Sequence, residues 1–372
     1  MHRAPILRIL SFSLALVMLH VAFFAQAQQG GETDPARCWA RPASEMTQLA
    51  GDRGGLFATG RDARLAAFSL EGDKLWTSEL GGDITSNLLL LENSVVVAAS
   101  AVSTNGSPSG TAVRSLSRET GIAGWSTPVS TAPRHFLGRA NGSVIVVSSA
   151  GTIEALDPAT GAVRWRRQIA EGFAGGPAMN DTNLFVASRA GQLFAISVAT
   201  GEIDSTRKLT SALTVPATAG SEGGVVVGDE RGNITALENV EKLNWRFKTG
   251  GSVSALYMVD GSLLAASHDN FVYFLSGRNG AMSWKKRLSG RATRVGLVNG
   301  TYALVSSIDE HGATLLDLAS GRVAGQILLG PGEVVLDEPV TIGDRIFILT
   351  NEGINSFGLR GCIRKEEAAR VR

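Results

Sequence analysis

Residues that commonly carry out chemistry are few in this sequence, and they stand far apart. Beyond residue 27 the histidines are His135, His268 and His311. A zinc site needs histidine, cysteine or carboxylate ligands that converge on one ion, and no such spacing links these three. The serine-rich stretch 103–107 lacks the G-x-S-x-G turn that exposes a nucleophilic serine. The sequence therefore predicts no catalytic residue, no metal ion and no bound cofactor.

The overall charge gives no sign of a polyanionic partner. The chain has 372 residues, with 35 Lys and Arg against 34 Asp and Glu, so its formal net charge is +1. Proteins that bind DNA or RNA through phosphates carry a basic patch or an excess of positive charge. We therefore expect no nucleic acid among the partners.

The first 27 residues have the pattern of a secretory signal peptide. Arg3 and Arg8 supply the positive charge, residues 9–24 are mostly apolar, and Ala25-Gln26-Ala27 matches an A-x-A cleavage site. The apolar run is short for a membrane-spanning helix, which needs about 20 residues, although a retained anchor remains an alternative. We expect a mature chain that begins near Gln28, has no transmembrane segment, and is periplasmic or secreted.

The two cysteines, Cys38 and Cys362, lie near opposite ends of the expected mature chain. An even number of cysteines in an exported protein favours a disulfide bond. Two unrelated free thiols are the alternative, but exposed thiols oxidise outside the cytosol. We therefore expect Cys38 and Cys362 to be bonded to each other.

These sparse residues are set within a strong internal repeat. The stretch 155–165 reads ALDPATGAVRW, and related stretches recur along the chain about every 40 residues, with one longer step. The last position of the repeat holds, in chain order, Trp76, Trp125, Trp165, Ser205, Trp245, Trp284 and Gly325. Between these positions short apolar runs alternate with glycine turns, which is typical of four-stranded propeller blades.

The repeat resembles that of the PQQ-like β-propeller family, whose pattern is roughly A-x-D-x-x-T-G-x-x-x-W. The resemblance covers nearly the whole expected mature chain. It implies that each tryptophan packs between neighbouring blades against the glycine of the turn. Ser205 and Gly325 have lost the aromatic ring, so we expect looser packing at those two interfaces.

The spacing also predicts how the ring closes. One repeat before Trp76 falls near Trp39, beside Cys38, and one repeat after Gly325 falls near Cys362. We therefore expect an all-β fold with one eight-bladed propeller, in which the N-terminal strand completes the last blade; seven blades are the alternative. The expected boundaries are 1–27 for the signal, 28–37 for a linker, 38–363 for the propeller and 364–372 for a charged tail.

The innermost strand of each blade should begin just after the crossover from the previous blade. The charged or titratable residues in these segments are candidates for lining the central channel: Asp83, Arg134, His135, Arg291, Arg294, Glu333 and Asp337. A solvated wall whose charges pair with one another is the plainer interpretation. A ligand-binding channel is the functional one.

Among PQQ-repeat proteins, the short exported rings without catalytic residues resemble the BamB family, scaffolds of the bacterial outer-membrane β-barrel assembly machinery. BamB proteins are usually lipoproteins, and this sequence has no cysteine at the cleavage site. The resemblance implies a protein-interaction scaffold of the cell envelope, with the barrel-assembly core as a partner, and a closed ring predicts a monomer. The alternatives are a sensor that binds a small molecule in the channel and a PQQ-dependent dehydrogenase, although such dehydrogenases are longer and carry adjacent cysteines.

Overall fold

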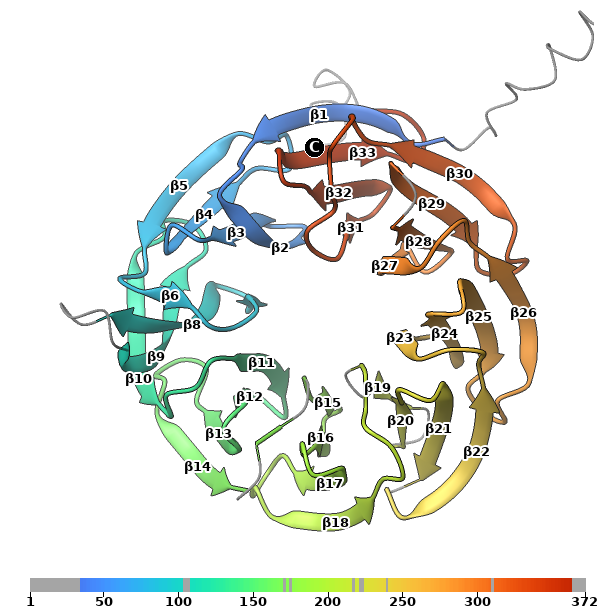
Figure 1. Ribbon diagram of the computed structural model, residues 1–372. Helices are drawn as coiled ribbons and strands as arrows, with labels where there is room; N and C mark the ends of the chain where they lie inside the picture. The colour runs from blue at the N-terminus through green and yellow to red at the C-terminus, as the bar shows by residue number, and fades with distance from the viewer. Residues whose placement is uncertain are drawn as a thin grey trace, which may run out of the picture.

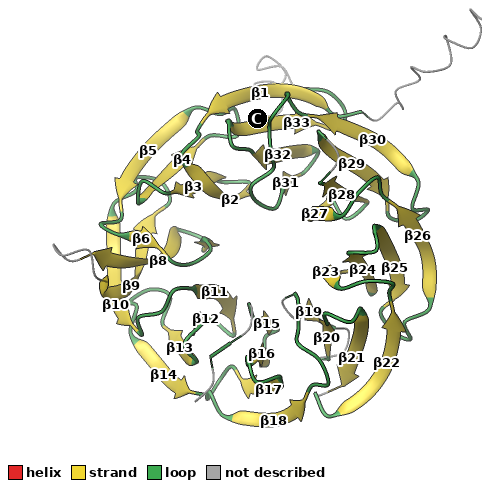
Figure 2. Ribbon diagram, in the orientation of Figure 1, coloured by secondary structure: helices red, strands yellow, loops and turns green. Residues whose placement is uncertain are grey.

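The chain folds into a ring of eight blades, as the repeat predicted (Figure 1). The computed structural model describes residues 34–102, 108–169, 172–173, 176–215, 218–220, 224–238, 240–308 and 311–362. These residues form 33 strands in eight antiparallel sheets and no helix (Figure 2). None of them forms a helix long and apolar enough to cross a membrane.

The first four blades follow one another along the chain. Blade 1 consists of β2 (Met46–Asp52), β3 (Gly55–Gly60), β4 (Arg64–Phe68) and β5 (Lys74–Glu79). Blade 2 consists of β6 (Asp83–Ile84), β7 (Leu89–Leu90), β8 (Ser94–Val102), β9 (Pro108–Ser117) and β10 (Ala123–Val129). Blade 3 consists of β11 (His135–Ala140), β12 (Ser143–Ser148), β13 (Thr152–Leu156) and β14 (Val163–Gln168). Blade 4 consists of β15 (Ala178–Met179), β16 (Asn183–Ala187), β17 (Gln192–Ser197) and β18 (Ile203–Lys208).

The remaining four blades complete the circle. Blade 5 consists of β19 (Thr218–Ala219), β20 (Val225–Gly228), β21 (Asn233–Glu238) and β22 (Lys242–Lys248). Blade 6 consists of β23 (Val253–Val259), β24 (Ser262–Ser267), β25 (Phe271–Ser276) and β26 (Met282–Arg287). Blade 7 consists of β27 (Ala292–Val298), β28 (Tyr302–Ser307), β29 (Gly312–Asp317) and β30 (Val323–Leu328). Blade 8 consists of β31 (Val340–Ile342), β32 (Arg345–Leu349), β33 (Gly353–Gly358) and β1 (Ala36–Pro42).

Burial follows the position of a strand within its blade. Middle strands such as β3 and β12 are buried at every residue, because both of their faces pack against neighbouring blades. Outer strands such as β5 and β14 alternate between exposed and half-buried residues. The hydrophobic core is accordingly divided into eight clusters, each shared by two adjacent blades. Burial of this apolar surface between blades is what drives them to stack.

Six blade interfaces share a tryptophan clasp. Each of the six indoles donates its N–H to a backbone carbonyl in the last turn of the next blade, at 2.7–3.0 Å. A glycine with φ between 69° and 85° lies under each ring, and a Cβ at that glycine would come within 3.0 Å of the ring. The glycine is required for two reasons: it adopts a left-handed backbone conformation, and it makes room for the indole. The pairs are Trp39–Gly72, Trp76–Gly121, Trp125–Gly161, Trp165–Gly201, Trp245–Gly280 and Trp284–Gly321.

A second contact, two residues after the tryptophan, strengthens four of these clasps. Ser78 and Thr127 donate their hydroxyls to the carbonyls of Gly121 and Gly161, at 2.6 and 2.7 Å. Arg41 and Arg167 donate Nε to the corresponding glycine carbonyls, at 3.0 and 2.7 Å. The turn carbonyls, which strand pairing leaves free, are thereby satisfied by the preceding blade.

The two ends of the chain meet in blade 8. Strand β1 pairs antiparallel with β33, and a disulfide joins Cys38 to Cys362, whose Cα atoms are 5.3 Å apart. The first strand begins at Ala36, two residues before the expected start of the propeller. The expected signal peptide, most of the linker, the C-terminal tail and the serine-rich stretch 103–107 lie outside the described residues.

Candidate functional site in the central channel

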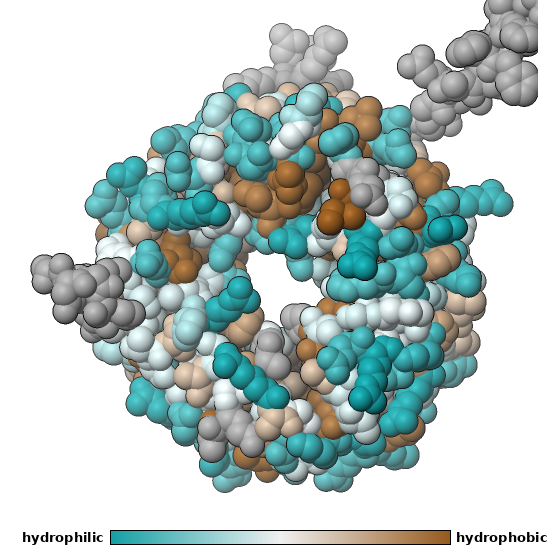
Figure 3. Space-filling view, viewed as in Figure 1, coloured by the Kyte–Doolittle hydropathy of each residue, from teal (hydrophilic) through white to brown (hydrophobic). Residues whose placement is uncertain are grey.

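Two of the predicted channel residues, Arg294 and Asp337, lie together on the channel wall. Arg294 is on β27, the inner strand of blade 7, and Asp337 precedes β31, the inner strand of blade 8. With Tyr257 on β23 of blade 6 and Glu338 they line a cavity of about 230 Å³. The space-filling view shows the central opening that these inner strands surround, with hydrophobic residues gathered beside it over blade 8 (Figure 3).

Hydrogen bonds tie this site to four blades. The Tyr257 hydroxyl donates to Oε1 of Glu338 at 2.6 Å. Arg294 donates Nη2 to the carbonyl of Leu336 at 2.9 Å. Oδ2 of Asp337 accepts the backbone N–H of Leu49, on β2 of blade 1, at 2.8 Å. The crossover between blades 7 and 8 is therefore held from both sides of the ring.

Burial shifts the titration of the acidic groups in the site. It raises the pKa of Asp337 and of Glu338 above their usual values, because partial dehydration disfavours the charged carboxylate. The hydrogen bond from Leu49 to Asp337, the one from Tyr257 to Glu338 and, less strongly, the charge of Arg294 oppose the shift. Burial, followed by the neighbouring Glu338, raises the pKa of Tyr257 far above its ordinary value. Tyr257 is therefore a fixed hydrogen-bond donor at any physiological pH.

A second cavity continues the site toward blades 1 and 2. Its volume is about 440 Å³, and Asp337 and Glu338 form part of its wall too. The opposite wall is mixed, with the apolar side chains of Leu49 and Leu88 beside the amides of Gln48 and Asn87. The two cavities together present carboxylates, a guanidinium, amides and apolar surface. This combination can hold a polar segment by hydrogen bonds and ion pairs.

The described residues contain no group of three His, Cys, Asp or Glu side chains placed to hold a metal ion. His135 is buried, with 1% of its surface exposed, so it does not face the channel. Its Nε2 lies 2.8 Å from the carbonyl of Ser130 and its Nδ1 lies 2.9 Å from the Thr85 hydroxyl. Because a carbonyl only accepts, Nε2 carries the proton, and the ring joins blade 3 to blade 2 as a neutral structural group.

Comparison with known proteins places this ring in a family. A family model described as outer membrane protein assembly factor BamB matches residues 27–149, 149–222 and 204–355. The chain belongs to this family. No curated protein matched the sequence.

Two solved structures share the family's propeller fold. The crystal structure of BamB from Moraxella catarrhalis is 15% identical, with a TM-score of 0.66, and the match covers 87% of this chain and 99% of that one. The computationally designed Ika8 protein is 16% identical, with a TM-score of 0.71, and the match covers 88% and 99% of the two chains. At these identities the likeness establishes the fold alone.

The other predicted channel residues are scattered. Asp83, Arg134 and Arg291 are exposed at or just before the start of inner strands in blades 2, 3 and 7. Glu333 lies elsewhere: its Oε2 is 3.2 Å from Nη2 of Arg37, which is on the outermost strand β1. The crossover from β30 to β31 runs from the rim of the ring to its axis, and Glu333 lies in the rim half of that loop.

Sequence reasoning missed Tyr257 and Glu338, although both line the site. Glu338 directly follows Asp337, so an Asp-Glu pair just before an inner strand was a usable signal. Tyr257 lies in the interior of β23, where an aromatic residue is usually interpreted as core. Nothing local in the sequence distinguishes it from a packed strand residue.

Proposed function

We propose that this chain is a non-catalytic scaffold of the periplasm that binds proteins during outer-membrane protein assembly. The observation that carries the proposal is the match of the BamB family model over residues 27–355 of a closed eight-bladed ring. The signal-like segment 1–27 supports export. The wall around Asp337 and Glu338 offers the partner a polar surface.

The test is an affinity capture of the tagged chain from gently solubilised envelopes of its own host, with partners identified by mass spectrometry. We expect the barrel-assembly core to be recovered, and an Arg294→Ala, Glu338→Gln variant to recover at least about fivefold less. Lys242→Ala, on the outer strand β22 far from the channel, is the matched control. Recovery of the core at background level by the wild-type chain would contradict the scaffold role.

A small-molecule role of the channel is the second candidate, because two cavities meet at Asp337 and Glu338. A ligand with an ammonium group would suit these carboxylates. Under this alternative, a diamine such as putrescine raises the melting temperature saturably, and Glu338→Gln abolishes the effect. A PQQ-dependent dehydrogenase would instead acquire a visible chromophore when the chain is incubated with the quinone and Ca²⁺.

A further inference from the structure

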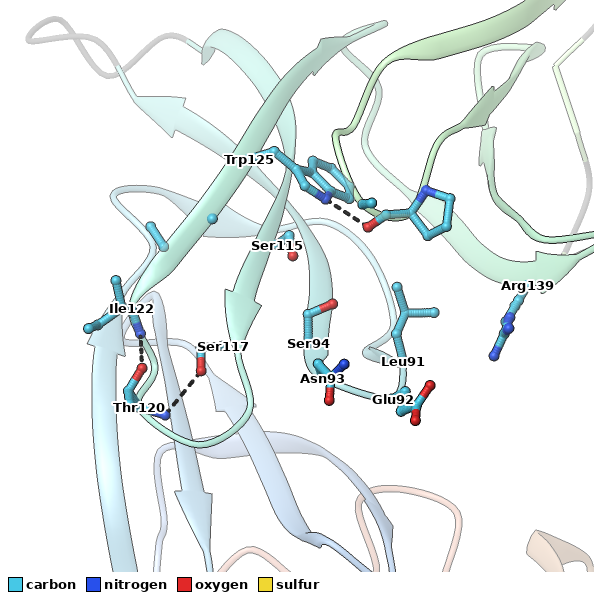
Figure 4. Close-up of a pocket in the computed structure, with 14 residues that line it drawn as sticks. Leu91, Glu92, Asn93, Ser94, Ser115, Ser117, Thr120, Ile122, Trp125 and Arg139 are labelled. Carbon is cyan, nitrogen blue, oxygen red and sulfur yellow. Dashed lines mark hydrogen bonds between the residues drawn. The ribbon is translucent and has the colours of Figure 1, made fainter.

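A further cavity of the ring lies away from the channel. It has a volume of about 870 Å³ and lies between blades 2 and 3 (Figure 4). Glu92, in the turn between β7 and β8, and Ser94, the first residue of β8, line it, and Ser117 and Gly124 line it from the outer half of blade 2. Arg139, on β11 of blade 3, forms the opposite wall. We call this cavity the corner pocket.

Blade 3 fills the equivalent corner with a side chain of its own. In each outer strand the residue before the tryptophan position lies at a shift in strand register. In blade 3 this residue is Arg164. Its Nη1 donates to the carbonyl of Gly142 at 3.1 Å and to the hydroxyl of Ser143 at 2.8 Å, and its Nη2 donates to Oδ2 of Asp157 at 2.7 Å.

Blade 4 closes the same corner with different residues. The position of Arg164 is held there by Asp204, whose Oδ2 accepts a hydrogen bond from Nδ2 of Asn183 at 3.0 Å. In both blades a side chain of the outer strand reaches the turn of the inner hairpin. In blade 2 the equivalent residue is Gly124, which has no side chain, and the corner stays open.

The groups that accept hydrogen bonds from Arg164 in blade 3 have counterparts in the corner pocket. Ser94 begins β8 as Ser143 begins β12. Ser117 takes the place of Asp157, because the backbone carbonyl of each residue accepts the N–H of the turn glycine four residues later, at 2.9 and 2.8 Å. A carboxylate is supplied by Glu92. Among the described residues, neither Glu92 nor Arg139 has an ion-pair partner.

We propose that the corner pocket binds an arginine side chain of a partner protein, in the place that Arg164 occupies in blade 3. The guanidinium meets Ser94, Ser117 and Glu92. The aliphatic part of the side chain lies against Ile122, which is 70% exposed, and against Trp125. A guanidinium presents five N–H donors in a rigid plane, which suits hydroxyl and carboxylate acceptors spread over two turns.

Two features of the pocket limit the affinity. The carbonyl of Asn93, which corresponds to that of Gly142, already accepts the N–H of Arg118 at 3.1 Å and keeps one lone pair. Arg139 places a positive charge on the far wall. We therefore expect weak binding of an isolated arginine, and tighter binding once the opposing charge is removed.

The inference rests on the proposed scaffold role for its protein ligand, so the first test uses small probes that do not depend on that role. N-acetyl-arginine methylamide is titrated into the full chain, with the lysine and citrulline counterparts as controls, and amide shifts are followed by NMR. We expect saturable shifts at Ser94, Ser117 and Gly124, with arginine binding at least about threefold more tightly than lysine and citrulline not binding. Equal binding of arginine and citrulline would overturn the proposal.

Gly124→Arg is the decisive variant, because it fills the corner from within. A Cβ at Gly124 would be 3.5 Å from its nearest neighbour, the carbonyl oxygen of Ser115, so a side chain fits. We expect Gly124→Arg to bind the arginine probe at least tenfold more weakly, and the matched Gly124→Ala to bind it as the wild type does. Retained binding in Gly124→Arg, with an unchanged melting temperature, contradicts the site.

Two further variants separate a cationic from an anionic ligand. Arg139→Ala should tighten arginine binding by about two- to fivefold. Arg164→Gly should create a second site, reported by new shifts at Ser143. If acetate binds instead, and Arg139→Ala abolishes that binding, the pocket holds an anion and the proposal is wrong.

Envelope capture with Gly124→Arg then tests the protein ligand. Loss of one partner that Gly124→Ala retains supports the inference. Retention of every partner by a variant that no longer binds the probe overturns the partner claim. If the wild-type chain captures no envelope protein while the probe binds, the scaffold role fails and the guanidinium site stands.

Discussion

The interface between blades 3 and 4 and the interface between blades 4 and 5 are built from the same repeat but are closed differently. In the first, Trp165 covers Gly201 and donates to the carbonyl of Val198. In the second, Ser205 stands at the tryptophan position, and the facing turn of blade 5 contains Val240 with φ of 65°. That turn is one residue shorter than the blade 4 turn, since Leu237 pairs with Leu243 whereas Ile196 pairs with Ile203.

The tryptophan therefore depends on the blade that it faces. In blade 5 the buried side chain of Val240 lies in the turn, so an indole has no room to pack against that turn. The other interface without the ring, between blades 7 and 8, has the same cause in another form: blade 8 has no turn there, because its last two strands come from opposite ends of the chain. The disulfide stands where the turn would be.

The interface between blades 4 and 5 lacks the indole but keeps the second hydrogen bond of the clasp. Arg207, two residues after Ser205, donates to the carbonyl of Val240 at 3.3 Å and also to that of Glu241. Its equivalent at the tryptophan-closed interface is Arg167. The contrast between these two interfaces leads to five predictions, ordered from the largest expected effect.

Removing an indole should lower the free energy of unfolding more than any of the other changes. Trp245 is 6% exposed and is bonded to the carbonyl of Gly277 at 2.8 Å. We expect Trp245→Ala to lower the free energy of unfolding by about 3–5 kcal/mol. Ser205→Ala, at the interface without an indole, removes only a hydroxyl and should cost no more than about 1.5 kcal/mol. Urea denaturation measures both, and equal losses would contradict the distinction between the two kinds of interface.

Removing the disulfide should cause the second-largest loss of stability. Cys38 and Cys362 are separated by 324 residues, and a cross-link over so long a loop restricts the unfolded chain strongly. We expect the Cys38→Ser, Cys362→Ser variant to be less stable by about 2–4 kcal/mol under oxidising conditions. Under reducing conditions the variant and the wild type should unfold together. An unchanged unfolding midpoint in air would show that strand pairing alone closes the ring.

A methyl group added under an indole should destabilise the protein more than a methyl group added at a turn with no neighbouring atoms. Gly201 has φ of 73°, and a Cβ there would lie 2.5 Å from the Trp165 ring. Gly142 has φ of 64° with no atom within 4 Å. We expect Gly201→Ala to cost about 2–4 kcal/mol, from overpacking and backbone strain, and Gly142→Ala to cost about 1 kcal/mol, from strain alone. Thermal unfolding of the two variants checks the difference.

The two arginines should differ in importance. Arg207 bridges an interface that has no indole, whereas Arg167 assists one that does. We expect Arg207→Ala to destabilise the protein by about 1–2 kcal/mol and Arg167→Ala by about half as much. Denaturant unfolding of both variants measures this. A larger loss for Arg167→Ala would show that the second contact reinforces the indole and does not replace it.

The smallest effect concerns pH. Burial lowers the pKa of His135, so the unfolded chain binds a proton near pH 6.5 that the folded chain does not. Stability contributed by neutral His135 is therefore fully present above pH 6.5 and is lost as the pH falls toward the folded pKa. We expect the free energy of unfolding to fall by about 1 kcal/mol or less between pH 7 and pH 5.5. In His135→Gln the fall should be smaller, and an identical pH profile would exclude this histidine as its source.

The architecture of this protein follows from local signals in its sequence. Repeat spacing, turn glycines and the tryptophan positions are local signals, because a glycine under an indole is needed wherever the clasp forms. The phase of Trp39 and the positions of Cys38 and Cys362 extended the same logic to the closure in blade 8, and the eight-bladed ring was predicted from them.

The sites, in contrast, depend on contacts between blades that are distant in the sequence. Tyr257, Arg294 and Glu338 come from three blades and meet because ring closure brings inner strands around one axis. Glu333 lies in the same crossover as Asp337 yet pairs with Arg37 at the rim, since a long radial loop spans both environments. The corner pocket stays open because Gly124 has no side chain to fill the space between blades 2 and 3. Sequence spacing fixes which strand a residue occupies, but it does not carry the distances between residues of different blades.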